Sequence, residues 1–352
     1  MSKIVIIGAG AMGSAFAFPC LDRDHDTNII GTHLENEFID ELKKKNNFHP
    51  GLKTNIPKTI NILKFEQFEN ISKSKIDLLV LGISSKGIKW VSEELGKIYQ
   101  NLELPNMLML TKGLSVGPHE HTNRYELLVD KLDRLLRAKG IKKTNISVVA
   151  GPCLAAGLAN RVHSSVVIAN KDIKIASAIS DLLETSHYYH STFSDDLIGV
   201  EVCAAIKNIY SMAIGASKGL CKYKPTADEK NNYLNTAASI FQQSIYEMEI
   251  FTEYLKGKKE TVSGLAGLGD LYVSSAGGRN SKMGSYLGEG MTFSQAKKTK
   301  MENITVEGAD LIFEIGKRIK EDFNEKQLPI MIAMIDAILE DKKLEIKWSY
   351  FN

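Results

Sequence analysis

The segment Lys3-Ile-Val-Ile-Ile-Gly-Ala-Gly-Ala-Met-Gly13 decides the fold of this chain. A short strand-like run leads directly into the pattern Gly8-x-Gly10-x-x-Gly13, which opens a helix-like stretch. In this setting the first glycine permits a tight turn, the second lets a pyrophosphate approach the backbone, and the third lets helix and strand pack closely. The N-terminus of the helix then faces the phosphate groups. The segment predicts a dinucleotide site, and the alternative is a structural turn that binds no ligand. The predicted contacts are Gly8, Gly10, Ala11, Met12 and Gly13.

Outward from this segment, the first half of the chain alternates strand-like and helix-like stretches. The strand candidates are continuous runs of Val, Ile, Leu and Met, which is typical of strands covered on both faces. Such alternation indicates an α/β fold with a doubly wound parallel sheet of the Rossmann type. We expect strands at residues 3–7, 28–31, 77–83, 106–111, 145–150 and 164–169, and helices at 11–21, 35–45, 86–99, 123–138 and 173–184.

The strand pattern stops near residue 195, and the remainder of the chain reads as helices. We therefore expect two domains, a dinucleotide-binding domain at 1–195 and an all-helical substrate domain at 196–352. The most polar connector, 222–232, is a candidate mobile loop. The expected helices lie at residues 196–218, 227–256, 260–272, 280–288, 293–299, 306–319 and 330–341.

The composition is that of a globular chain, with 352 residues, 43% hydrophobic and 24% charged. A net charge of +2 gives no reason to expect nucleic acid or an anionic membrane as a partner. Four cysteines without a C-x-x-C spacing indicate a reducing, cytoplasmic setting. We expect no signal peptide and no membrane span, because glycines and charges interrupt the apolar runs. His119-x-His121 lacks companion ligands at zinc spacing, so no metal site is expected.

Lys207 lies in the middle of the most uniformly apolar helical stretch, residues 197–216. Lysine is almost never fully buried without a partner. Desolvation favours the neutral amine, so a buried lysine is suited to donate and accept a proton near neutral pH. Asp270, among the small residues at 264–270, is a candidate counter-charge. The alternative is a lysine whose stem packs in the core while its amine reaches the surface.

Two further strand ends carry candidate ligand contacts, because ligands of open α/β sheets bind beyond the carboxyl ends of the strands. Thr111-Lys112-Gly113 follows one strand and Gly151-Pro152-Cys153 follows another. Each places a side chain beside a glycine at the ligand edge. For Lys112 alone, a surface lysine after a strand is an equally good interpretation.

The second strand should end in the residue that distinguishes NAD from NADP. An acid at this tip favours NAD and an arginine favours NADP. Here the strand ends Gly31-Thr32-His33-Leu34-Glu35, and we find neither residue at the tip itself. Thr32 and His33 could donate to a 2′-phosphate, which favours NADP slightly without excluding NAD.

Gly277-Gly278-Arg279-Asn280 has the composition of an oxyanion site. The two glycines permit a backbone nest, Arg279 offers a guanidinium fork, and Asn280 can cap the helix that follows. We therefore expect a bound phosphate or carboxylate here. The alternative is an ordinary glycine turn with a surface arginine.

Taken in this order, the motifs resemble those of the NAD(P)-dependent glycerol-3-phosphate dehydrogenases over essentially the whole chain. The resemblance implies a Rossmann domain followed by an all-helical domain. It also implies interconversion of dihydroxyacetone phosphate and sn-glycerol 3-phosphate with NAD or NADP, which supplies the glycerol phosphate backbone of lipids. Many members act as dimers, so we expect a homodimer. The likeness rests on residues 8–13, 111–113, 151–152, 205–208, 264–270, 278–280 and 306–308.

Carried over by position, the resemblance assigns roles to individual residues. Lys207 resembles the family's proton donor and acceptor, and Lys112 and Asp270 resemble its catalytic partners that hold substrate. Arg279 and Asn280 resemble the contacts to the substrate phosphate. Further substrate contacts are implied at Gly151, Cys153 and Gly278, and further cofactor contacts at Thr32, His33, Lys112, Ala155, Arg279 and Glu307.

Two other functions stay open from the sequence. A related two-domain dehydrogenase of the ketopantoate or opine type would act on another small keto acid, whereas Arg279 after a double glycine favours a phosphorylated substrate. A non-catalytic dinucleotide-binding sensor is the second alternative. It would not require a lysine inside an apolar helix.

Overall fold

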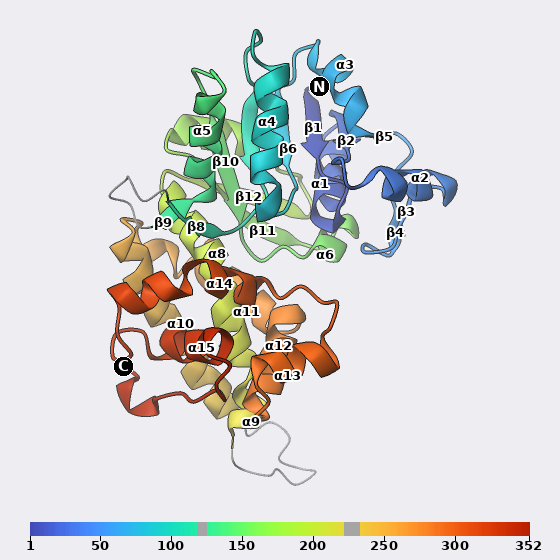
Figure 1. Ribbon diagram of the computed structural model, residues 1–352. Helices are drawn as coiled ribbons and strands as arrows, with labels where there is room; N and C mark the ends of the chain where they lie inside the picture. The colour runs from blue at the N-terminus through green and yellow to red at the C-terminus, as the bar shows by residue number, and fades with distance from the viewer. Residues whose placement is uncertain (118–124, 222–232) are drawn as a thin grey trace. The chain divides into compact units, whose positions relative to one another are not determined.

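The computed structural model describes residues 1–117, 125–221 and 233–352. These residues form two compact units (Figure 1). The first comprises Met1–Lys112 and Leu128–Leu197, and the second comprises Gly113–Leu127 and Ile198–Asn352. The second unit therefore includes a segment from the first half of the chain, which a single division at residue 195 does not foresee.

The first unit is built on an eight-stranded sheet with the order β12-β11-β10-β7-β6-β1-β2-β5. Each of the six strands expected from the sequence is present, and two further strands extend the sheet at its edges. The glycine-rich segment follows β1, which lies between β6 and β2 near the middle of the sheet. The strands are β1 (Lys3–Ile7), β2 (Asp26–Ile30), β5 (Asn61–Leu63), β6 (Leu78–Leu81), β7 (Asn106–Met109), β10 (Ile146–Ala150), β11 (Ser164–Ala169) and β12 (Tyr189–Ser194).

The doubly wound parallel sheet expected from the sequence is present, with one antiparallel pairing near an edge. The six strands from β5 to β10 run parallel, but β11 pairs antiparallel with β10, with Val149 opposite Ile168. The strand β12 then runs parallel to β11. A parallel crossover needs a connection with a helix that spans the sheet. The link between β10 and β11 holds only the five-residue α6 (Ala155–Ala159), so the chain turns back beside β10.

Helices cover both faces of the sheet, as the continuous apolar strands predict. The connection from β1 to β2 and the connection from β6 to β7 advance in opposite directions along the sheet, so right-handed crossovers place their helices on opposite faces. Ile4 and Ile6 pack in one core with Phe16 of α1, while Val5 and Ile7 face the other side. Figure 1 shows α4 and α5 side by side. The helices of this unit are α1 (Ala11–Asp22), α2 (Asn36–Lys44), α3 (Phe68–Ser72), α4 (Ile88–Ile98), α5 (Leu128–Ala138), α6 and α7 (Ile173–Leu183), with a small hairpin of β3 (Phe48–His49) and β4 (Thr54–Asn55).

Where the structure describes it, the second unit is helical apart from one short hairpin. Its central helix α8 carries Lys207, and nearly all of its residues are buried. The stretch Leu197–Leu220 is the one described helix with the length and hydropathy of a membrane span, and 89% of its most apolar window is buried within the structure. A core helix has the same properties. The elements are β8 (Leu114–Val116), β9 (Tyr125–Leu127), α8 (Leu197–Gly215), α9 (Ser217–Leu220), α10 (Tyr233–Tyr254), α11 (Asp270–Ser275), α12 (Arg279–Gly288), α13 (Phe293–Lys300), α14 (Glu307–Asp322) and α15 (Pro329–Leu339), with short 3₁₀ turns at Lys259–Thr261 and Trp348–Tyr350. Two further 3₁₀ turns, at Phe65–Gln67 and Ser85–Gly87, belong to the first unit.

In two of the expected helices, part of the range forms a different kind of structure. The helix expected at 123–138 begins only at Leu128, because Tyr125–Leu127 pairs with β8 as a strand. The helix expected at 260–272 is interrupted, since Leu265–Gly269 forms a π-helical turn before α11 begins. The candidate mobile loop at 222–232 and the motif His119-x-His121 lie outside the described residues.

Glycines let two helices approach α8 closely next to Lys207. A Cβ on Gly284 of α12 would lie 1.8 Å from the carbonyl oxygen of Met212, and a Cβ on Gly308 of α14 would lie 2.7 Å from that of Asn208. Side chains at these positions would force the helices apart. The N-terminus of α14 is thus held against the residue that follows Lys207.

Candidate active site

The glycine-rich turn has the shape that a dinucleotide needs. Gly8 adopts φ +113° and donates its N–H to the carbonyl of Ile30 at 2.7 Å. A Cβ on Gly8 would lie 2.4 Å from the carbonyl oxygen of Gly82, and a Cβ on Gly13 would lie 2.2 Å from that of Gly8. Around Gly10, by contrast, the nearest atom that the described residues bring to such a Cβ, apart from the adjoining backbone, is Oε1 of Glu35 at 3.9 Å. The turn is therefore closed where strand and helix pack and open where a pyrophosphate approaches.

Side chains hold the peptide groups of Ala9 from both sides. The carboxylate Oε2 of Glu35 accepts from the N–H of Ala9 at 3.1 Å and from the N–H of Thr32 at 2.8 Å. The carbonyl oxygen of Ala9 accepts from the hydroxyl of Ser14 at 3.0 Å and lies 3.1 Å from Nε2 of His49. Neither Glu35 nor His49 is among the site residues that the sequence predicts. An acid does reach the tip of β2, because Glu35 folds back from the start of α2.

The ring of His49 has a defined tautomer. Its Nδ1 accepts from the N–H groups of Gly51 and Leu52, at 3.1 and 3.2 Å. Nε2 therefore carries the proton and donates it to the carbonyl of Ala9. Burial lowers the pKa of His49 below its ordinary value. A neutral imidazole thus fastens the hairpin of β3 and β4 to the glycine-rich turn.

The other expected site residues of the first unit lie at the carboxyl ends of β2, β7 and β10. Thr32 and His33 follow β2, and the His33 ring packs against Trp90 with centroids 4.6 Å apart. Lys112 follows β7 one residue after Thr111, whose hydroxyl donates to the carbonyl of Ile83 at 2.9 Å. The structure therefore gathers these residues at the ligand edge of the sheet, together with Gly151, Cys153 and Ala155 after β10.

In the second unit, Lys207 and Asp270 form a buried ion pair. The two residues are only 7% and 3% exposed. The Lys207 ammonium donates to Oδ1 of Asp270 and to the hydroxyl of Ser274, the latter at 2.9 Å. Ser211 donates to the carbonyl of Ser274 at 2.8 Å, so α8 and α11 are tied together at this point. The amine does not extend to the surface, and the counter-charge expected from the sequence is present.

Arg279, Asn280 and Glu307 form a second polar cluster in the same unit. Arg279 pairs with Oε1 of Glu307, and the amide of Asn280 donates to Oε2 of the same carboxylate at 3.3 Å. Oδ1 of Asn280 accepts from the N–H of Gly308 at 2.9 Å. The expectation that Asn280 caps α12 is wrong, because it caps α14 instead. The N-cap residue of α12 is Gly278, with φ +97°, which has no side chain to cap the helix.

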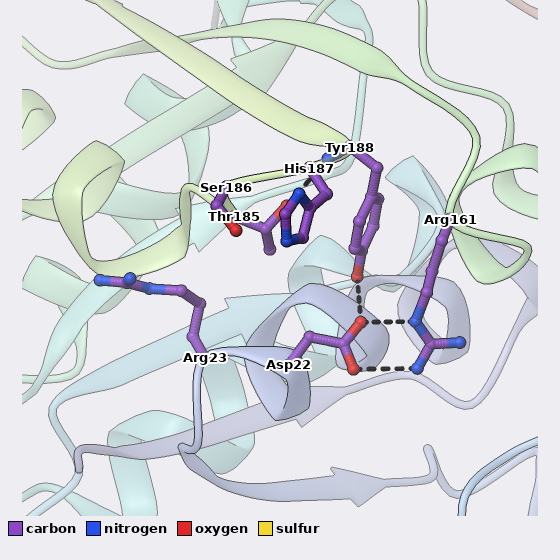
Figure 2. Close-up of a pocket in the computed structure, with 7 residues that line it drawn as sticks. All are labelled: Asp22, Arg23, Arg161, Thr185, Ser186, His187 and Tyr188. Carbon is purple, nitrogen blue, oxygen red and sulfur yellow. Dashed lines mark hydrogen bonds and ion pairs between the residues drawn. The ribbon is translucent and has the colours of Figure 1, made fainter.

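A hollow of about 370 Å³ at the other end of α1 lies away from the expected site residues (Figure 2). Asp22 and Arg161 form a bidentate ion pair within it, at 2.7 and 2.9 Å. Tyr188 donates to the same carboxylate at 2.7 Å. Because Asp22 ends α1 while the glycine-rich turn begins it, this hollow is separate from the dinucleotide site.

An open glycine turn on a Rossmann-type sheet and a buried lysine–carboxylate pair in a helical unit define an NAD(P)-dependent oxidoreductase. Residues 3–176 match the family model for the N-terminus of NAD-dependent glycerol-3-phosphate dehydrogenase, and residues 196–347 match the model for its C-terminus. The chain belongs to this family.

Relatives of known name agree with this membership. The chain is 29% identical over 312 residues to the NADP(+)-dependent glycerol-3-phosphate dehydrogenase of Archaeoglobus fulgidus, covering 88% of this chain and 85% of the relative. It is 28% identical over 343 residues to glycerol-3-phosphate dehydrogenase [NAD(P)+] of Francisella tularensis subsp. novicida, covering 96% and 93%. The crystal structure of glycerol-3-phosphate dehydrogenase from Coxiella burnetii has the same fold, with a TM-score of 0.76, 21% identity and coverage of 97% and 96%.

Proposed function

We propose that this chain interconverts dihydroxyacetone phosphate and sn-glycerol 3-phosphate, with Lys207 as the proton donor and acceptor. The observation that carries the assignment is the ammonium of Lys207, buried in the centre of α8 and held by Asp270. A structural role alone does not require two buried charges, because a hydrophobic pair of similar volume is often at least as stable. Bound NAD(P) supplies or takes up the hydride at the carbon of the substrate.

The proton transfer follows from the pairing. During reduction, negative charge develops on the carbonyl oxygen of the substrate, and Lys207 donates a proton to that oxygen. Asp270 favours the charged ammonium and fixes its direction, and Ser274 accepts a second N–H. In the reverse direction the neutral amine of Lys207 accepts the hydroxyl proton, while the hydride leaves the same carbon.

The phosphate of the substrate is proposed to bind at the N-terminus of α12. Arg279 is about half exposed, and Gly278, the N-cap residue of α12, has no side chain to cap the backbone N–H groups that follow it. Guanidinium and helix N-terminus together favour a dianion. Glu307 would hold the Arg279 side chain in place and contact the cofactor. In the first unit we propose Lys112, Gly151 and Cys153 as substrate contacts.

We further propose a cytoplasmic homodimer as the working form of the enzyme. The four cysteines of the chain and the composition support a reducing compartment. Light scattering of the purified protein tests the dimer, and fractionation of cells that express it tests the compartment.

The proposed function is tested by following NADH and NADPH oxidation with dihydroxyacetone phosphate side by side. We expect turnover with at least one cofactor, and Lys207→Ala should reduce kcat by at least about a thousandfold while cofactor still binds. Lys317→Ala is the matched control, since Lys317 is exposed on α14. Near-full activity of Lys207→Ala would refute the role of Lys207, and no turnover with either cofactor would refute the function.

A further inference from the structure

The carboxylate of Glu35 is fixed by one oxygen and offers the other to a ligand. Oε2 accepts both backbone N–H groups, from Ala9 and Thr32. Oε1 accepts no hydrogen bond from the residues that the structure describes, and it lies 3.9 Å from the place of a Cβ on Gly10. Oε1 is therefore a hydrogen-bond acceptor whose orientation is fixed by the bonds to Oε2, and it faces the open part of the glycine-rich turn beside Gly10.

The charge of Glu35 is not neutralised by a cation in the described parts of the chain. No lysine or arginine pairs with it there, and Lys64, just after β5, pairs with Asp40 at 2.7 Å. From the sequence, Thr32 and His33 are candidate donors to a 2′-phosphate. In the structure the N–H of Thr32 is already bonded to Glu35, and the ring of His33 packs on Trp90.

We propose that Glu35 makes this chain select NAD(H) over NADP(H). In dinucleotide-binding sheets, an acid at the end of the second strand accepts from the ribose 2′-hydroxyl of NAD, whereas a 2′-phosphate requires a cation. Oε1 of Glu35 supplies that acceptor, and its charge repels a phosphate. This inference rests on the proposed function, because it concerns the cofactor of the same reaction. It reverses the preference for NADP that the tip of β2 predicts from sequence.

Equilibrium binding of NADH and NADPH, followed by nicotinamide fluorescence without substrate, tests the selection. We expect the wild-type protein to bind NADH at least about tenfold more tightly than NADPH. Glu35→Gln keeps the shape and removes the charge, so it should bring the two dissociation constants within about threefold. Glu37→Gln, an exposed change of the same charge two residues away, should keep the wild-type ratio.

Salt gives a second readout that needs no variant. Repulsion is screened by salt, so the ratio of the NADPH to the NADH dissociation constant should fall as ionic strength rises from about 0.01 to 0.5 M. A wild-type protein that binds NADPH as tightly as NADH would overturn the inference and leave the proposed function intact. A ratio unchanged by Glu35→Gln and by salt would overturn it too. Failure to bind either dinucleotide would instead overturn the proposed function and this inference together.

Discussion

The ammonium of Lys207 and the carboxylate of Asp270 form an ion pair in which both groups are almost completely buried. They come from α8 and from the first residue of α11, which begins directly after a π-helical turn. The turn is tight, since a Cβ on Gly267 would lie 2.1 Å from the carbonyl oxygen of Val262. Backbone packing therefore fixes the carboxylate before any ligand binds.

Removing one partner of this pair should destabilise the protein more than removing both. Asp270→Leu leaves a buried ammonium without its counter-charge, and we expect the free energy of unfolding to fall by about 3–5 kcal/mol. The double variant Lys207→Met/Asp270→Leu removes both charges and should recover most of that loss, as measured by urea denaturation. Both variants should lack turnover. If the double variant is no more stable than Asp270→Leu, charge burial is not the cause.

Arg279 should act on the substrate through its phosphate. We expect Arg279→Ala to raise the KM for dihydroxyacetone phosphate at least about tenfold, because a charge-assisted contact is lost. Reduction of dihydroxyacetone, which lacks the phosphate, should change little in the same variant. Lys282→Ala, which removes one exposed positive charge from the same helix, is the control. Equal losses with both substrates would place Arg279 outside the phosphate site.

The sequence predicts those features that depend on local pattern or on a strong physical requirement. Gly8 and Gly13 follow a strand, and their packing is the one that the motif predicts. Lys207 and Asp270 are separated by 63 residues, yet a buried lysine needs a counter-charge and Asp270 lies among small residues. In the first case close packing of strand and helix requires glycine, and in the second a buried ammonium requires a carboxylate. Each requirement is specific enough to identify the residue that meets it.

Features that depend on where a distant element packs are not visible in the sequence. In the sequence, Glu35 looks like an ordinary acid at the start of a helix. Only the hydrogen bond from the N–H of Ala9 to its carboxylate shows that the side chain folds back to the glycine-rich turn. Asn280 caps α14 rather than its own helix, because Gly308 brings that N-terminus close to it. The reversed direction of β11 depends on how the chain leaves β10, which hydrophobic periodicity does not encode.

The stability of the first unit should decrease in mild acid because of His49. Its folded-state pKa lies below the ordinary value of 6.5, so the unfolded chain binds the proton more readily. The stabilisation is complete above about pH 6.5 and is lost as the pH falls below it. We expect the free energy of unfolding of His49→Gln to depend less on pH between 7.5 and 5.5. His187→Gln, at an exposed histidine, should retain the wild-type dependence, and an unchanged slope in His49→Gln would exclude His49 as the source.

Glu247 should produce the opposite pH dependence in the second unit. Burial raises the pKa of Glu247 to about 8, although the N–H groups of Ile330 and Met331 donate to it at 2.8 and 2.9 Å. The folded protein thus holds a proton that the unfolded chain releases near pH 4.5. The stabilisation that this proton provides is complete below about pH 4.5. It decreases as the pH rises toward 8, by up to about 1.4 kcal/mol per pH unit.

Glu247→Gln tests this dependence because the amide keeps the acceptor at the N-terminus of α15 and cannot ionise. We expect the variant to gain stability relative to the wild type as the pH rises from 5 to 8, measured by urea denaturation at each pH. Glu260→Gln, at an exposed acid of the same unit, should run parallel to the wild type. A constant difference between Glu247→Gln and the wild type over this range would mean that Glu247 is already ionised in the folded protein. In that case the hydrogen bonds from the two backbone N–H groups lower the pKa of Glu247 by more than burial raises it, and an ionised carboxylate caps α15.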